Sequence, residues 1–143
     1  MAQYTVNAAE VKPLSGQPIL TGIAAEVIAA GQSITKNGSG QIVLARSDST
    51  AALANCRGVA VSSATLIGQP INYVDEGDVQ LDNASIVDAA VGDLASLGPN
   101  PGGLYPFGDQ TSTQYLTIVG QIIQNSGGTK LRMHPWPTGT QVP

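Results

Sequence analysis

The chain has 143 residues, of which 42% are hydrophobic and only 11% are charged, and its formal net charge is −4. This length suits one domain or a compact pair of small lobes, and the hydrophobic fraction excludes a disordered tail. The six Lys and Arg residues are spread along the chain. They form no cluster that would bind phosphates or an anionic membrane, so we expect neither nucleic acid nor a membrane as a partner.

Apolar runs are short throughout the sequence. The longest, from Ile23 to Ala30, is interrupted by Glu26 and could not span a bilayer. The first residues lack the basic region and apolar stretch of a secretory signal. We therefore expect the protein to be made and assembled in a cytoplasm.

Residues 1–18 are predicted to form an extended arm. Pro13 and Pro18 break any helix, and a proline cannot donate a hydrogen bond to an interior strand ladder. The arm carries apolar side chains that are candidates for contact with another protein, namely Tyr4, Val6, Val11 and Leu14.

A mainly β domain is predicted for residues 19–134. The 17 glycines and nine prolines favour short strands joined by tight turns. Asn37-Gly38-Ser39-Gly40 between two alternating segments predicts a hairpin over residues 32–45. Further strands are expected at 57–62, 70–74 and 79–81, with an exposed turn at 76–78. One short capped helix is expected near 50–55.

The second half of the domain resembles the first in the order of its glycines and apolar residues. The similar segments are 30–34 and 91–95, 40–43 and 103–106, 57–61 and 119–123, and 68–72 and 128–132. This pattern predicts two similar β units, approximately 19–82 and 83–134, packed around one core. Coincidence in a glycine-rich chain is the alternative.

A proline-rich tail is predicted at residues 135–143. Pro135 and Pro137 bracket Trp136, the only tryptophan, so the segment is expected to be neither a helix nor a central strand. Trp136 is a candidate interface residue because interfaces favour tryptophan as an anchor. Packing of Trp136 onto its own core is the alternative.

The inventory of reactive side chains argues against catalysis. His134 and Cys56 are the only residues of their types, which is too few for an imidazole or thiolate metal site. No nucleophile or phosphate-binding motif is present. We expect Cys56 to be buried and Asp75, Glu76, Asp78 and Asp82 to surround a solvated turn. The sequence predicts no enzyme activity, no cofactor and no metal site.

Taken in order, Ala30-Gly31-Gln32, the hairpin ending in Gly40-Gln41-Ile42, Arg57-Gly58-Val59 and Gly68-Gln69-Pro70-Ile71 give a pattern that resembles the tailed-phage capsid decoration proteins. These small head-stabilising, or cement, proteins bind the outside of the shell. The resemblance covers roughly residues 19–132 and depends on patterns of glycine and hydrophobic residues.

The resemblance implies a compact β-barrel or β-tulip-like domain and a homotrimer on the capsid surface of a bacteriophage. The function would be that of a structural virion protein, which bridges neighbouring subunits of the major capsid protein and so stabilises the shell. The arm would then order on the shell or add a strand to a neighbouring sheet.

Two other readings stay open. The first is a non-catalytic ligand- or carbohydrate-binding β module, which would need an aromatic platform. The second is an unfamiliar hydrolase acting through Asp75 and Asp78, which would need a cavity that gathers these two carboxylates.

Overall fold

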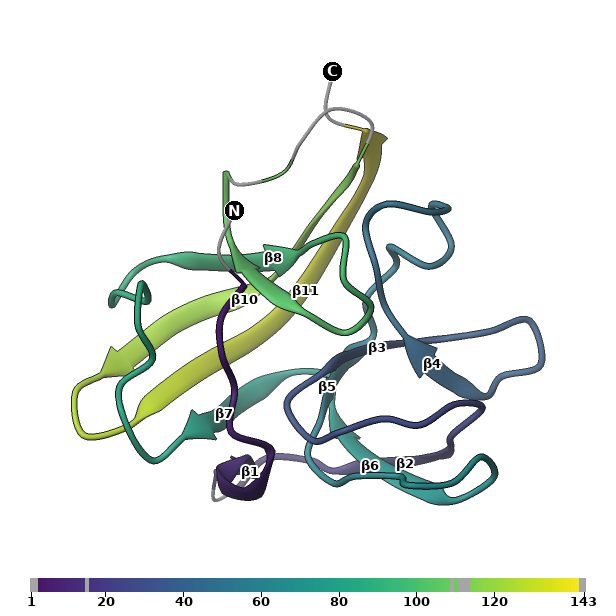
Figure 1. Cartoon of the computed structure of the whole chain (residues 1–143), viewed down its shortest axis with the longest axis horizontal. Coiled ribbons are helices and arrows are strands. Elements are labelled where there is room, and N and C mark those ends of the chain that lie inside the picture. Colours follow the sequence, from purple (N-terminus) through teal and green to yellow (C-terminus); the bar gives the residue numbers. More distant parts are fainter. Residues whose placement is uncertain (1–2, 15, 109, 111–113, 142–143) are drawn as a thin grey trace.

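The computed structural model describes residues 3–14, 16–108, 110 and 114–141. It consists of two antiparallel sheets that lie beside each other, joined by tight turns (Figure 1). The prediction of a mainly β fold is confirmed. Residues 1, 2 and 15 of the expected arm and residues 142 and 143 of the expected tail lie outside the described residues.

The small sheet has five strands in the order β2-β6-β5-β3-β4. Their bounds are β2 Leu20–Ile23, β6 Pro70–Val74, β5 Gly58–Ala60, β3 Ser33–Lys36 and β4 Ile42–Leu44. The predicted hairpin is confirmed, because β3 pairs with β4 antiparallel. Asn37 closes its turn by accepting hydrogen bonds from the amides of Ser39 and Gln41 at Oδ1, over 2.9 and 3.0 Å.

The large sheet has six strands in the order β1-β7-β11-β10-β8-β9. Their bounds are β1 Lys12–Pro13, β7 Gly77–Asp82, β11 Thr129–Gln141, β10 Tyr115–Asn125, β8 Leu94–Leu97 and β9 Leu104–Pro106. The hairpin of β10 and β11 is its longest feature and extends beyond the neighbouring strands near the C-terminus (Figure 1).

The sheets do not close into the barrel that we expected. Within the described residues neither sheet closes through a ladder: β1 does not pair with β9, and the edges of the small sheet meet only at a single parallel bridge between Ala24, the residue after β2, and Ile42 of β4. Loops and the N-terminal arm cover most of the outer strands instead. The expected barrel is therefore replaced by two sheets that share a core.

The helix expected near 50–55 is also absent. The segment forms turns with a single i to i−4 bond, from the Ala54 amide to the Thr50 carbonyl oxygen over 3.1 Å. Thr50 Oγ1 also accepts from the Leu53 amide, as a capping residue would. A helix this short has too few bonds to offset the cost of nucleation, and the chain enters β5 only a few residues later.

The two sheets share one strand order. The order β2-β6-β5-β3-β4 of the small sheet matches the order β7-β11-β10-β8-β9 of the large sheet if the strands of each sheet are matched in chain order, so that β2 is equivalent to β7 and β6 to β11. Strands that are neighbours in one sheet are then equivalent to strands that are neighbours in the other. The registers correspond as well. The pairs Ser33–Val59 and Ile34–Gly58 of the small sheet match Leu94–Gln121 and Ala95–Gly120 of the large sheet.

The turns that enter the corresponding strands β3 and β8 also match. Gly31 and Gly92 have positive φ values of 90° and 96°. The Gly31 amide donates to the Ala60 carbonyl and the Gly92 amide to the Ile122 carbonyl, each over 2.8 Å. Two of the segment matches seen in the sequence keep this register, at 30–34 and 57–61.

The other two segment matches differ from the pairing in the structure by one or two residues. When the two sheets are aligned by their strand registers, Gly40 is equivalent to Gly102 rather than to Gly103. In the same alignment Tyr73 is equivalent to Leu131 rather than to Met133.

A hydrophobic core joins the two sheets. Val59 and Val74 of the small sheet pack in one cluster with Val79, Ile122 and Leu131 of the large sheet. A second cluster is formed by the small sheet and the segments that follow β2 and β5. It comprises Ala24, Ile28, Ile34, Ile42, Ala60, Ala64, Ile71 and Tyr73. The shared cluster holds the sheets in one body.

The N-terminal arm packs onto its own domain. Tyr4 is 2% exposed and Val11 is 8% exposed, and both belong to the shared core. The arm includes a single 3-10 turn, η1 (Ala8–Glu10), and then adds β1 to the edge of β7. Pro13 is tolerated there because β1 is an edge strand.

Residues 135–141 of the expected tail belong to β11. The strand has β7 as a neighbour only as far as Met133, which pairs with Gly77, and beyond that it pairs with β10 alone. Register shifts interrupt the pairing of β10 with β11 between Ile118 and Gly120 and between Tyr115 and Thr117. Pro135 and Pro137 therefore lie in a part of β11 that is paired on one side only and whose pairing is interrupted by bulges. Strands tolerate proline at such positions.

Candidate protein interface

The outer face of the large sheet carries the exposed Trp136. Along β11, Leu131 and Met133 point into the core, whereas Arg132, His134 and Trp136 point to solvent. This alternation follows from the two-residue period of a strand. Trp136 is 63% exposed and is the cross-strand partner of the half-buried Ile118.

A shallow hollow of about 230 Å³ lies beside Trp136. Its lining residues are Leu94, Ile118, Gly120, Gln121, Arg132, His134 and Trp136. Gly120 is the one residue of this lining that has no side chain. A Cβ atom there would clash with the carbonyl oxygen of Arg132, so this position requires glycine.

The apolar surface continues along the outer face past Leu94. A second depression next to it is lined by Gly92, Asp93, Leu94, Pro106 and Phe107, so Leu94 belongs to both hollows. Phe107 is 46% exposed. We call the exposed Trp136 and Phe107, together with the half-buried Ile118 and Leu94, the apolar stripe. A continuous stripe of this kind on a rigid sheet is typical of a protein interface.

An ion pair and a histidine–carboxylate contact border the stripe on its polar side. The Arg132 guanidinium donates from Nε to Asp78 Oδ1 over 3.0 Å, and this hydrogen bond raises the pKa of Arg132. His134 Nδ1 lies 2.9 Å from Glu76 Oε1. Each pair joins β11 to β7 or to the bend before it. These contacts orient the polar side chains that frame the stripe.

The structure separates the five residues that were expected at an interface. Trp136 is exposed on the outer face, whereas Tyr4 and Val11 are buried in the core of their own chain. Val6 and Leu14 are half-buried on the arm. Tyr4 and Val11 would contact a partner only if the arm left its domain, whereas Trp136 is accessible as the structure stands.

Sequence reasoning missed the partners of Trp136 on the stripe. Ile118, Leu94 and Phe107 come from three different strands or turns, and only the registers of β8, β10 and β11 place them on one face. The period-two pattern of β11 is the signal that could have placed Arg132, His134 and Trp136 together.

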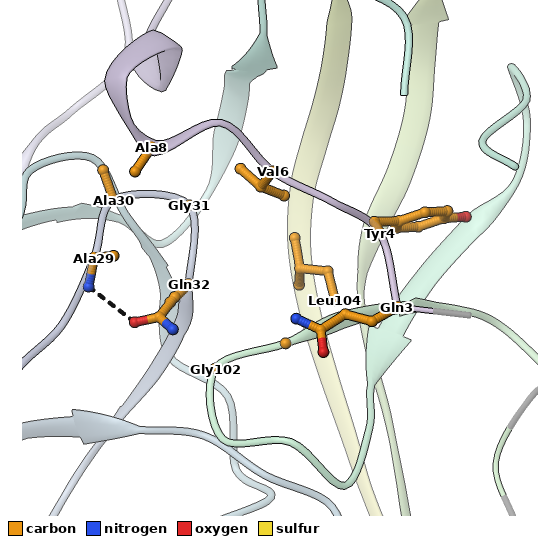
Figure 2. A pocket seen from close by; sticks show the side chains of 11 residues that line it. Gln3, Tyr4, Val6, Ala8, Ala29, Ala30, Gly31, Gln32, Gly102 and Leu104 are labelled. Carbon is orange, nitrogen blue, oxygen red and sulfur yellow. Dashed lines mark hydrogen bonds between the residues drawn. The ribbon is translucent and has the colours of Figure 1, made fainter. Parts of the chain in front are cut away.

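A cavity of about 140 Å³ lies where the arm crosses the turns before β3 and β9 (Figure 2). In this view residues 29–32 lie on one side and Val6, Leu104 and Gln3 on the other, and Gln32 accepts a hydrogen bond from the Ala29 amide over 2.8 Å. The lining is Gln3, Tyr4, Val6, Ala8, residues 29–32 and residues 102–104, with no Asp, Glu, His, Lys, Arg or Cys among them. Such a lining offers no acid or base for chemistry.

None of the acidic residues at 75–82 lines any of the three hollows described above. Asp78 and Glu76 are engaged by Arg132 and His134. Among the described residues, no three His, Cys, Asp or Glu side chains come together in a way that could hold a metal ion. The bend falls at 75–76, and Gly77 already begins β7.

Cys56 is buried, as predicted, with 3% exposure. Burial raises the pKa of its thiol to about 12 from an ordinary value of 9.0, and Sγ donates to the Gly58 carbonyl over 3.4 Å. Because the thiolate is the nucleophile, a buried neutral thiol is unreactive.

We therefore expect Cys56 to resist a water-soluble disulfide reagent at pH 8 in the native protein and to react fully in denaturant. The unfolded chain releases the thiol proton near pH 9 and the folded chain does not, so this group also lowers stability as the pH rises above 9. Fast labelling of the native protein, measured by mass spectrometry, would contradict this description of the site.

No helix in the described part of the chain has the length and apolar character needed to cross a membrane. No family model, curated protein or solved structure matches this chain.

Proposed function

We propose that this chain is a structural virion protein that binds the outer surface of a tailed-phage capsid and stabilises it by bridging neighbouring subunits of the major capsid protein. The single observation that carries the proposal is the apolar stripe of Trp136, Ile118, Leu94 and Phe107 on the outer face of the large sheet. The identification of the partner as a capsid comes from the resemblance of the glycine and hydrophobic pattern.

The shape and chemistry of the stripe support binding by contact. It is shallow, its polar side chains are already paired, and it gathers no acid, base and nucleophile in a geometry for catalysis. A large aromatic side chain held by neighbouring strands is a typical anchor of an interface. Repetition of such a contact over a shell would add avidity to a modest affinity at each site.

We also propose that the two sheets are two copies of one β unit. The identical strand order, the corresponding registers and the matching turns at Gly31 and Gly92 support this. A homotrimer remains part of the proposal through the resemblance alone.

Trp136→Ala tests the contact. Because Trp136 is mostly exposed, we expect little change in the urea midpoint of unfolding. Because it is the proposed anchor of the interface, we expect about a 30-fold loss of affinity for expanded shells of the phage that encodes the chain. Co-sedimentation of the protein with shells over a concentration series measures both occupancy and affinity.

The matched control is Val87→Ala, a change at an 81% exposed apolar residue outside the stripe. This variant is expected to bind as the wild type does. Wild-type protein that never sediments with shells would overturn the proposed function, and full binding by Trp136→Ala would overturn the role of the stripe.

A carbohydrate-binding module is the second candidate. Three of the six aromatic side chains, Tyr4, Tyr73 and Tyr105, are buried at 2%, 4% and 3% exposure. Only Trp136, Phe107 and the half-buried Tyr115 remain for a platform. This candidate is therefore less well supported than a protein interface.

A further inference from the structure

The turn between β3 and β4 holds the one asparagine of the chain that is followed by glycine. The carboxamide of an asparagine can be attacked by the backbone nitrogen of the next residue, because the two groups close a five-membered ring. Glycine hinders this approach least, since it has no Cβ atom and the widest choice of backbone angles. Among the seven asparagines only Asn37 has such a successor, Gly38.

The structure leaves the nucleophile of this reaction free. Gly38 is exposed, and a Cβ atom at its position would meet nothing within 4 Å. The amides of Asn37, Ser39, Gly40 and Gln41 each donate a hydrogen bond within the turn. The Gly38 amide donates none of the hydrogen bonds found in the described part of the chain. Its nitrogen is therefore open to base and to the neighbouring carboxamide.

The same turn holds and polarises the electrophile. Asn37 Oδ1 accepts hydrogen bonds from the amides of Ser39 and Gln41, over 2.9 and 3.0 Å. These bonds keep the carboxamide beside the backbone that follows it. Two N–H groups aimed at this oxygen would also stabilise the negative charge that it gains when Cγ is attacked.

The other six asparagines lack this combination. Asn125 has both ends of its carboxamide bonded, because Oδ1 accepts from the Ile86 amide over 3.0 Å and Nδ2 donates to the Ala89 carbonyl over 2.6 Å. Pro101, which follows Asn100, has no N–H group. The remaining four successors carry side chains of alanine size or larger, and these are Ala8, Cys56, Tyr73 and Ala84.

We propose that Asn37 is a site of spontaneous covalent modification in the folded protein. The Gly38 nitrogen loses its proton to base and bonds to Cγ of Asn37, the Cγ–Nδ2 bond breaks, and Nδ2 takes a proton from solvent and leaves as ammonia. Water then opens the cyclic imide at either of its carbonyls and gives aspartate or isoaspartate. Both products carry one more negative charge than the starting chain. This inference is independent of the proposed function.

The two products differ in their effect on the turn. Aspartate keeps an Oδ1 atom for the amides of Ser39 and Gln41. Isoaspartate lengthens the main chain between β3 and β4 by one carbon atom and makes the carbonyl that accepts from the Gly40 amide part of a free carboxylate. Because β3 and β4 place Ile34 and Ile42 in the core of the small sheet, we expect the isoaspartate form to have a lower urea midpoint of unfolding.

Incubation of the full-length protein at mildly alkaline pH, followed by peptide mapping, tests the proposal. Trypsin cleaves after Lys36 and Arg46, so Asn37 is the only asparagine of its peptide. We expect this peptide to gain one mass unit at least about tenfold faster than any other peptide that contains asparagine. The Asn37→Asp variant marks the elution of the aspartate product, and a second peak of the same mass is isoaspartate. A sample digested at time zero corrects for conversion during digestion.

Gly38→Ala is the matched variant. It adds a Cβ atom in open space and touches none of the hydrogen bonds of the turn, so we expect an unchanged fold. Conversion at Asn37 is expected to slow at least about tenfold, because the added methyl group hinders the approach of the nitrogen. Wild-type chain in denaturing urea gives the rate without the turn. The folded protein is expected to react at no less than about a tenth of that rate.

The opposite results would each remove part of the inference. Conversion in the folded protein at less than about a tenth of the rate in urea would overturn it, because the turn would then protect Asn37. Equal rates for wild type and Gly38→Ala would overturn the Gly38 nitrogen as the nucleophile. Comparable conversion at another asparagine would overturn the selectivity assigned to this turn.

Discussion

Gly120→Ala is expected to lower the free energy of unfolding by about 3 kcal/mol. The new Cβ atom would meet the carbonyl oxygen of Arg132 and the side chain of Leu131, both on the neighbouring strand β11. Neither can move far, because Leu131 is fully buried and Arg132 of β11 is paired on both sides, with Asp78 of β7 and Gln121 of β10. Urea unfolding followed by circular dichroism measures the loss.

Gly58→Ala should have an effect of the same size. Gly58 occupies the position in β5 that Gly120 occupies in β10, and a Cβ atom there would meet the carbonyl oxygen of Val74 on the adjacent strand β6. Its φ of 157° adds backbone strain for any other residue. Similar losses at both positions would support the proposed duplication, and a loss at one position only would weaken it.

Gly38→Ala is the matched control for these two variants. Gly38 lies in the turn between β3 and β4, where a Cβ atom would meet nothing within 4 Å. We expect its free energy of unfolding to stay within about 0.5 kcal/mol of the wild type. A loss at Gly38 equal to that at Gly120 would contradict the explanation by close strand approach.

Tyr4→Ala is expected to cost about 3–5 kcal/mol of stability, the usual range for removing a buried aromatic side chain. Tyr4 is 2% exposed and packs in the core that joins the two sheets, and its amide holds the edge of β9. The arm is therefore part of the folded domain. Thermal and urea unfolding of the full chain measure the effect.

The neighbouring Thr5→Ala serves as the control, since Thr5 is exposed on the same arm. It should unfold as the wild type does. If Tyr4→Ala were equally stable, the arm would not contribute to the core, and the original expectation of an arm available to a neighbour would be restored. The comparison thus decides whether the arm stabilises its own chain.

The local turns of this protein follow from neighbouring residues, which is why the sequence predicted them. Asn37 and Gly40 form the β3–β4 turn through bonds within five residues, and Gly40 takes the positive φ of 77° that glycine readily adopts. The strands β5, β6 and β7 were likewise predicted near their true positions from short β-rich segments bounded by turn residues. The buried Cys56 followed from the usual location of free cysteine.

Of the four residues of the apolar stripe, only Trp136 was predicted from the sequence to lie at an interface. Its neighbours Ile118, Leu94 and Phe107 are 18 to 42 positions away in the sequence, and strand pairing alone brings them onto one face. The register shift between Ile118 and Gly120 sets which residues of β10 face outward. A single-residue difference there would turn the apolar residues to the other side, and no local pattern fixes that choice.

The sequence by itself determined a mainly β chain with few reactive groups, because composition and turn residues act locally. Only the tertiary structure decided that two sheets form without closing into a barrel, and that the arm packs into the core of its own domain. The reason is physical: which strand pairs with which depends on long-range burial and register, and neither is encoded by adjacent residues.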